Sequence, residues 1–333
     1  MEEPGHGVRR ICGGRVVVCG SLAFDEVFTV EGSLQLASDH LGPVRQSYVA
    51  FQAHTSFGGC AGNIGYALAG LNRNPIVVAS VGNDAGSYAE HLIQHSIDIS
   101  SVTEYADILT ARCVVVTDLS GAQLVAFHPG AAGRYAPLPE VSSYTPLAIV
   151  APSTTDSVIK QMIRLKQLGA PILWLPAHSV ADYRDGQLHS LLRCSEYVIV
   201  NETEGQILCS MAQVSPTELA KQLKAYVVTL GERGSTLYSK GQSHHIAPVP
   251  TEAVDPTGCG DFYAAGFAHA VIAGLDLVSA AGVGSVMGAL NASHKGTQTF
   301  EFRLDDVYTR FYQVYGYRLP SASVDADGGC ELP

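Results

Sequence analysis

Six short, mostly apolar runs recur along the chain, and they constrain its fold more than any other feature. They span residues 15–20, 76–81, 147–151, 172–176, 197–200 and 226–230. Segments with helical periodicity or composition lie between them, at residues 61–71, 88–94, 156–168 and 217–224. Continuous apolar runs are typical of strands that are buried on both faces. Strands that alternate with helices predict an α/β protein, with a central, mostly parallel sheet and helices on both of its faces.

Two stretches depart from this alternation. Residues 27–56 contain no clear helix, and residues 110–129 indicate two strands, at 111–117 and 123–128, joined by a turn at Ser120-Gly121. We expect a small β-sheet lid built from about residues 27–56 and 108–130, with a peripheral hairpin that has no lid function as the alternative. One domain is expected over residues 15–320, with a flexible start at 1–14 and a polar, disordered tail at 321–333.

The charge balance excludes several kinds of partner. With 20 basic and 31 acidic side chains, the net charge is −11, and the basic footprint of a nucleic-acid or anionic-membrane binder is absent from the sequence. No apolar run approaches the roughly 18 residues of a membrane span. The eight cysteines are scattered singly, as is typical of a reduced compartment. We therefore expect a cytoplasmic protein without nucleic-acid or membrane partners, in which a local device holds any bound anion.

The sharpest local signal is the sequence DPTGCGDFYAAGF at residues 255–267. Gly258, Cys259 and Gly260 precede a strongly helical, alanine-rich segment. Glycines let the backbone approach a ligand closely, and a helix N-terminus presents unpaired N–H groups and the positive end of the helix dipole. The pattern predicts an anion site. Asp261 beside it either handles a proton or simply caps the helix.

A second glycine-rich turn, GGCAGN at residues 58–63, also opens a helix. It lacks the G-x-G-x-x-G spacing of a dinucleotide site. The dipeptide Gly-Lys occurs nowhere in the chain, so a P-loop is excluded. By itself the second turn is either a structural tight turn or part of a substrate site.

These two motifs, in this order and about 200 residues apart, resemble the two signatures of the ribokinase-like (PfkB) carbohydrate and nucleoside kinase family. The first signature is similar to GGxxGN at 58–63, and the second to DxTGxGD at 255–261. Between them, NxxE at 201–204 and VTLGxxG at 228–234 are similar to two further family motifs. Local spellings look most like bacterial-type adenosine kinases. The resemblance covers nearly the whole chain and implies a ribokinase-like fold.

The resemblance also implies roles in phosphoryl transfer. Asp261 would take the proton of the acceptor hydroxyl, while the N–H groups of Gly258, Cys259 and Gly260 would stabilise the transferring phosphoryl group. Glu204 would organise Mg²⁺ through water, unless it serves only as an acid at a helix start. The family's use of a monovalent cation implies K⁺ beside Asp255 and Thr257. The residues implied to hold ATP are Asn201, Thr229, Gly231, Gly234 and Asn291, of which the two glycines could equally serve only the turn.

The acceptor side follows from the same resemblance. The implied ribose site consists of Ser21, Asp25, Gly58, Gly59 and Asn63, with Asp25 accepting hydrogen bonds from the sugar hydroxyls. Phe127 on the lid would stack on the base, unless it only packs within the lid. Such stacking is worth about 1–3 kcal/mol per base and favours a nucleoside over a bare sugar. Cys113 departs from the subgroup, which often has a second aromatic there.

We therefore predict an enzyme that transfers the γ-phosphoryl group of ATP to the 5′-hydroxyl of a nucleoside, with adenosine, converted to AMP, as the first choice. The alternatives are a sugar kinase for ribose or a ketose, and a nucleoside sensor without turnover. Members of the family often pair through the lid, and exposed strand edges favour pairing. A homodimer through the lid is therefore expected.

Overall fold

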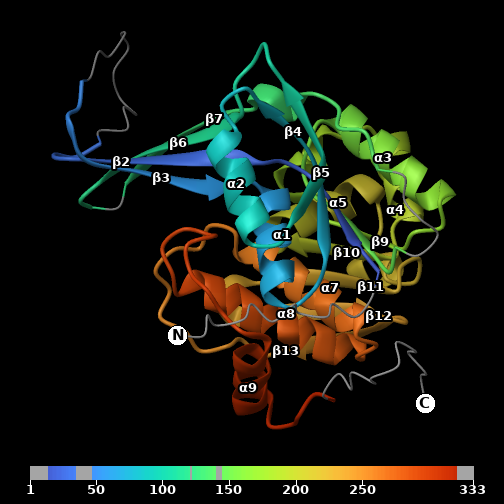
Figure 1. The fold of residues 1–333 in the computed structure, drawn as a ribbon. Helices are drawn as coiled ribbons and strands as arrows, with labels where there is room; N and C mark the ends of the chain where they lie inside the picture. The colour runs from blue at the N-terminus through green and yellow to red at the C-terminus, as the bar shows by residue number, and fades with distance from the viewer. Residues whose placement is uncertain (1–13, 35–46, 121, 140–144, 321–333) are drawn as a thin grey trace, which may run out of the picture.

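The computed structural model describes residues 14–34, 47–120, 122–139 and 145–320 (Figure 1). Four predicted features lie wholly or partly outside these ranges. They are the flexible start at 1–14, the tail at 321–333, residues 35–46 of the predicted lid and Gly121 of the predicted turn.

Among the described residues, nine strands form one large sheet in the order β13-β12-β11-β10-β9-β8-β1-β4-β5. The strands from β11 to β5 pair in parallel, and β12 and β13 add an antiparallel edge. The predicted mostly parallel sheet is thus confirmed, and all six apolar runs lie in it. The strands are β1 (Val16–Cys19), β4 (Pro75–Gly82), β5 (Asp98–Tyr105), β8 (Ala148–Val150), β9 (Ile172–Trp174), β10 (Tyr197–Asn201), β11 (Ala225–Thr229), β12 (Ser235–Ser239) and β13 (Gln242–Ile246).

Helices cover both faces of this sheet, as predicted. One core contains side chains of α1, α2, α7, α8 and α9, and a second core contains side chains of α3 to α6. Strand β1 shows the alternation: Val16 and Val18 face the first core, and Val17 and Cys19 face the second. The helices are α1 (Cys60–Gly70), α2 (Gly86–Gln94), α3 (Thr155–Gln167), α4 (Asp185–Cys194), α5 (Glu202–Ala212), α6 (Pro216–Leu219), α7 (Cys259–Ile272), α8 (Leu277–Ala292) and α9 (Leu304–Tyr315). None of the described helices is long and apolar enough to cross a bilayer.

One predicted helix is much shorter than expected. The segment 217–224 forms only α6, which ends at Leu219. Beyond it the backbone tightens, because Lys221 and Gln222 donate to carbonyls three residues earlier, Glu218 and Leu219. The chain then has to enter β11 at Ala225.

In the described part of the chain, a separate sheet of four strands, in the order β3-β2-β6-β7, extends away from the main body (Figure 1). We call it the lid sheet. Its strands are β2 (Ala23–Val30), β3 (Ala50–Gly58), β6 (Ala111–Asp118) and β7 (Gln123–His128), which confirms the two strands predicted within 110–129. The sheet begins at Ala23, earlier than the predicted boundary at residue 27, so Asp25 lies on a lid strand.

Candidate active site

The N-terminal turns of α1 and α7 meet at the base of the lid sheet. Asn63, in the first turn of α1, donates from Nδ2 to Oδ2 of Asp261 in the first turn of α7, at 2.8 Å. Gly258 precedes α7 with φ +74°, and a side chain there would collide with Thr297. Gly59 precedes α1 with φ +85°, and a Cβ there would lie 2.6 Å from the Ser21 carbonyl oxygen. The two glycine motifs, predicted separately, therefore form one site.

The carboxyl of Asp261 is strongly perturbed. Burial raises its pKa to about 6, and the charges of Asp25 and Glu204 add to the rise, while hydrogen bonds from Asn63 and Cys60 oppose it. A carboxylate titrating near 6 is a base of useful strength at neutral pH. Although Asp261 lies at a helix start, its buried environment is that of a proton acceptor rather than that of an exposed helix cap.

Asp25 is the second perturbed acid. Burial raises its pKa to about 6, with a further rise from the charge of Asp255. It points from lid strand β2 toward Gly58, and a side chain at Gly58 would overlap with its carboxylate. Ser21, close by in the chain, contributes its carbonyl, which accepts the N–H of Ala61 at 3.0 Å. The structure therefore brings together Ser21, Asp25, Gly58, Gly59, Asn63 and Asp261.

Hydrogen bonds with Asp255 and Asn291 fix the loop that precedes α7. Asp255 accepts the N–H of Thr257 at 2.9 Å and that of Gly296 at 3.1 Å. Asn291 is buried and donates to the Thr257 carbonyl at 2.6 Å and to the Cys259 thiol at 3.5 Å. The side chains of Asp255 and Asn291 thus hold the backbone of this loop through hydrogen bonds. Gly260 is exposed, with open space where a Cβ would stand, so a ligand has room there.

Asn201 and Glu204 form a capping box at the start of α5. Asn201 donates its backbone N–H to Glu204 Oε2 at 2.9 Å and its side-chain amide to Oε1 at 2.7 Å. Burial raises the pKa of Glu204, and the bond from the Asn201 N–H and the charge of His178 lower it. A carboxylate has about four acceptor positions, so two remain for water. Capping and ion organisation are therefore compatible in one motif.

Direct protein ligands for a metal are few. Within the described ranges, no group of three or more His, Cys, Asp or Glu side chains is placed to hold an ion. Mg²⁺ usually keeps several waters and binds one or two carboxylates together with substrate phosphates. A hydrated Mg²⁺ that also contacts ATP fits the half-buried Glu204, which faces the same acidic site as Asp25 and Asp261.

Four of the five predicted nucleotide residues lie at or just after the ends of β10 and β11, and the fifth, Asn291, lies near the end of α8. Thr229 is the last residue of β11 and donates to the Val200 carbonyl at 3.3 Å. Gly231 has φ +60° with open space around its Cα. Gly234 has φ +83°, and a side chain there would collide with the Ile246 carbonyl, so this glycine is required by the turn itself.

Phe127 is 55% exposed on β7, at the edge of the lid sheet. The strand register places Asp25 opposite Cys113, and Cys113 opposite Phe127. Directly paired residues point to the same face of a sheet. These three side chains therefore form one row across the lid.

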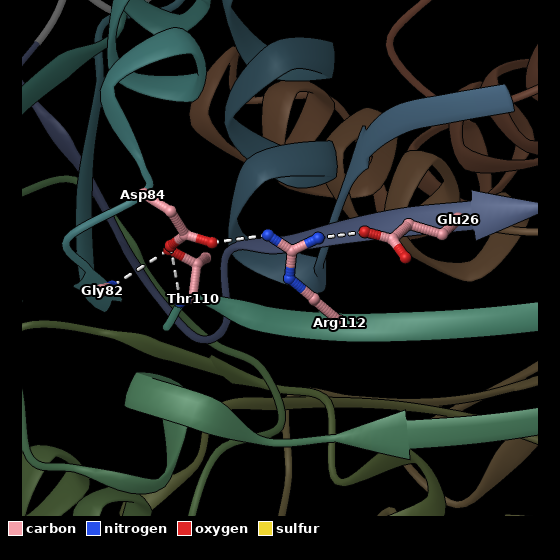
Figure 2. Close-up of polar contacts among 5 residues, drawn as sticks. All are labelled: Glu26, Gly82, Asp84, Thr110 and Arg112. Carbon is pink, nitrogen blue, oxygen red and sulfur yellow. Dashed lines mark hydrogen bonds and ion pairs between the residues drawn. The ribbon is translucent and has the colours of Figure 1, made fainter. Parts of the chain in front are cut away.

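A salt-bridge chain that the sequence did not reveal joins the lid to the body (Figure 2). Arg112 of β6 pairs with Glu26 of β2 and, at 2.6 Å, with Asp84 in the loop between β4 and α2. Asp84 also accepts the Thr110 N–H at 2.8 Å, and Gly82 donates to the Thr110 hydroxyl at 3.0 Å. We call Arg112, Glu26 and Asp84 the lid clamp. Its three members lie far apart in the sequence, so no local motif reveals it.

Comparison with known proteins agrees with this geometry. The sequence profile described as pfkB family carbohydrate kinase matches residues 15–302. The chain is 30% identical over 269 residues to a nucleoside kinase of Methanothermobacter thermautotrophicus, covering 79% of this chain and 87% of that protein. The structure of Burkholderia thailandensis nucleoside kinase in complex with inosine superposes with a TM-score of 0.80 at 30% identity, covering 91% of this chain and 99% of that one. The nucleoside kinase of Methanocaldococcus jannaschii, a member of the ribokinase family, shares the fold with a TM-score of 0.81 at 23% identity, covering 90% and 98%.

Proposed function

The chain belongs to the pfkB family of carbohydrate kinases and is a phosphotransferase with a hydroxyl acceptor, and from that premise we propose that it phosphorylates the 5′-hydroxyl of a nucleoside with ATP. Adenosine is the proposed preferred acceptor, with AMP as the product. The fold is ribokinase-like.

One observation carries the choice of a nucleoside. Asp25, Cys113 and Phe127 stand in one row across three neighbouring lid strands. Strands lie about 4.8 Å apart, so the backbone of Phe127 lies roughly 10 Å from that of Asp25. Side chains that start from two backbones at this separation leave room for a nucleoside between them. Asp25 would accept the ribose hydroxyls, and Phe127 would stack on the base.

The transfer itself follows from the two helix starts. Asp261 takes the proton as the acceptor oxygen bonds to the γ-phosphorus, and the bond from that phosphorus to the bridging oxygen of ADP breaks. The N–H groups at Gly258, Cys259 and Gly260, with the positive end of the α7 dipole, stabilise the charge on the phosphoryl oxygens. Burial raises the pKa of Asp261 to about 6, which makes its carboxylate a stronger base but leaves it mostly ionised, and so able to accept this proton, at neutral pH.

Cofactor binding is assigned to residues around these groups. Glu204, oriented by Asn201, would hold a hydrated Mg²⁺, and Asp255 with Thr257 would border a K⁺ site. When bound, Mg²⁺ neutralises phosphate charge. ATP would lie along Asn201, Thr229, Gly231, Gly234 and the α8 end that carries Asn291.

Two further proposals concern the setting of the enzyme. All six residues of edge strand β7 are exposed, including Leu124 and Val125, so we assign a homodimer interface to this side of the lid. Six cysteines within the described residues are free thiols, which suits a cytoplasmic location.

A coupled ADP-release assay tests the function, with adenosine, inosine, guanosine, cytidine, ribose and fructose as acceptors. We expect turnover with nucleosides, most efficiently with adenosine, and a 5′-monophosphate product in ³¹P NMR. The Asp261→Asn variant is the control for contaminating kinases. Turnover with free sugars alone would replace the proposal by a sugar kinase. Tight nucleoside binding without turnover would indicate a sensor.

A further inference from the structure

A chain of buried hydrogen bonds runs from the lid to Asp261. Tyr88 of α2 donates from its hydroxyl to the Gly58 carbonyl at 2.6 Å. Gln298 donates from Nε2 to the Tyr88 hydroxyl at 2.9 Å and to Asn63 Oδ1 at 3.0 Å. Asn63 then donates to Asp261 at 2.8 Å. We call this chain the Gly58–Asp261 relay.

The direction of every bond in the relay follows from its first member. A backbone carbonyl can only accept, so the Tyr88 hydroxyl donates its single proton to the Gly58 carbonyl. Tyr88 must then accept from Gln298, and this places the Gln298 amide nitrogen, not its oxygen, toward Tyr88 and Asn63. The Asn63 atom that faces Gln298 is therefore its oxygen. Its NH₂ group is left to face Asp261.

The neighbouring hydroxyl does not fix this direction. Thr297 lies 2.7 Å from Asn63 Oδ1 but also 3.1 Å from the Phe57 carbonyl, and it has one proton for the two acceptors. Gln298 is the group with an unambiguous donor toward Asn63. The relay also explains Gly62 in the first motif, because a side chain at Gly62 would overlap with the Tyr88 hydroxyl.

Burial makes the relay costly to break. The exposed fractions are 0% for Tyr88, 4% for Asn63 and 5% for Gln298. A buried polar group that loses its partner carries the whole desolvation penalty. The amides of Asn63 and Gln298 therefore keep one orientation, whether or not Asp261 carries a proton.

We propose that Tyr88 and Gln298 are positioning residues for phosphoryl transfer, which lock Asn63 as a hydrogen-bond donor to Oδ2 of Asp261. This inference rests on the proposed function, in which Asp261 is the base. While Asn63 occupies Oδ2, the transferred proton goes to Oδ1. If Tyr88 and Gln298 did not fix the Asn63 amide, the amide could flip, and a protonated Asp261 could donate to the Asn63 oxygen. That hydrogen bond would stabilise the protonated form of Asp261 and slow the release of its proton.

Other groups also act on Asp261, and all of them but Tyr88 stay in place in the test. They are Asp25 on β2, Cys60 on α1, Tyr88 itself on α2, Glu204 on α5 and Cys259 on α7. None of them except Tyr88 is changed by the variants below.

The test compares Tyr88→Phe with Tyr66→Phe. Tyr66 is a matched control, because its hydroxyl also donates to a backbone carbonyl, that of Phe300 at 2.7 Å, and its side chain is 5% exposed. Phe300 is not a member of the relay, so the Tyr66 hydroxyl proton is not donated to the relay. Tyr88→Phe removes the bond to Gly58 and the bond from Gln298, and we expect kcat to fall about tenfold, with the KM for ATP within about twofold of wild type. Tyr66→Phe should keep kcat within about twofold, although it too loses a buried hydrogen bond and lowers the melting temperature.

A second readout does not depend on activity. The carboxyl of Asp261 is titrated by ¹³C NMR in aspartate-labelled protein, and its resonance is identified by its absence in Asp261→Asn. We expect Tyr88→Phe to raise this pKa by about half a unit or more and Tyr66→Phe to leave it unchanged. Gln298→Met, which keeps the length but removes the donor, should repeat the effect and replaces Tyr88→Phe if that variant does not fold.

Equal kcat and equal Asp261 pKa in the two tyrosine variants would overturn the proposal and leave Tyr88 a packing role. The proposed function fails separately, if the wild-type protein phosphorylates no nucleoside. In that case the NMR titration still decides whether the relay controls Asp261.

Discussion

The carboxylate of Asp25 occupies the space that a side chain at Gly58 would take. The backbone of Gly58 is not left-handed, so it allows alanine, and the three atoms nearest to an alanine Cβ there all belong to the Asp25 carboxyl group. We expect Gly58→Ala to displace the carboxylate and raise the KM for the nucleoside at least about tenfold, the cost of a lost charge-assisted hydrogen bond. Gly86→Ala is the control, since its Cα faces open space. An unchanged KM in Gly58→Ala would remove Asp25 from the ribose site.

Asp261→Asn keeps the size of the side chain but removes the base. We expect kcat to fall by about 10²- to 10⁴-fold, the usual contribution of a general base, with nucleoside binding by calorimetry largely kept. Because burial raises the pKa of Asp261 to about 6, the folded state holds its proton more tightly than the unfolded state. The free energy of unfolding therefore falls as the pH rises from about 4 to above 6, and the variant should melt a few degrees higher than wild type at pH 7.5. Near-normal turnover would exclude Asp261 as the base.

The pH dependence of the reaction should show the perturbed acids. Asp261 and Asp25 both have a pKa raised to about 6, mainly by burial, and the proposed reaction uses both as carboxylates. We expect kcat/KM for the nucleoside to fall tenfold per pH unit or more steeply below about pH 6 and to be level above it. The two acids influence each other, so the apparent pKa of this acidic limb of the pH profile belongs to the pair rather than to either residue. A limb near pH 4, the ordinary carboxyl value, would contradict the buried geometry.

The lid clamp predicts a kinetic effect of Arg112. In Arg112→Met the apolar stem remains, but the ion pairs to Glu26 and Asp84 are lost. The lid should then separate from the body more readily, and we expect the KM for the nucleoside to rise about tenfold with a smaller change in kcat. Arg134→Met is the matched control, because it breaks an exposed pair with Asp107. Similar KM values for the two variants would show that the clamp does not control the lid.

The lid edge predicts the oligomeric state. Sedimentation at micromolar concentration should give twice the mass of the 35.1-kDa chain. Leu124→Lys places a charge on the exposed strand β7 and should produce a monomer with the same melting profile, because the side chain is 55% exposed. A wild-type monomer, or a dimer that persists in the variant, would move the interface elsewhere.

The large sheet is predictable from sequence because strands buried on both faces carry continuous apolar runs, as β1, β4 and β10 do. Strand β13, with the sequence QSHHI and four exposed residues, has no such signal. The glycine motifs predict the two helix starts, but not that they touch through Asn63 and Asp261. The clamp and the relay cannot be predicted from sequence because their partners are distant: Arg112 and Asp84 are 28 positions apart, and Tyr88 and Gln298 are 210 positions apart.

The thiols of Cys60 and Cys259 stand at the first residues of the two helices that form the site. A helix N-terminus commonly makes a cysteine acidic and reactive. Here burial and the surrounding carboxylates raise the pKa of both thiols instead. Oxidants and alkylating agents attack the thiolate, so we expect both sulfurs to react slowly at neutral pH. The carboxylates of Asp25, Asp255, Asp261 and Glu204 around them would then also make the proposed active site less sensitive to peroxide and electrophiles.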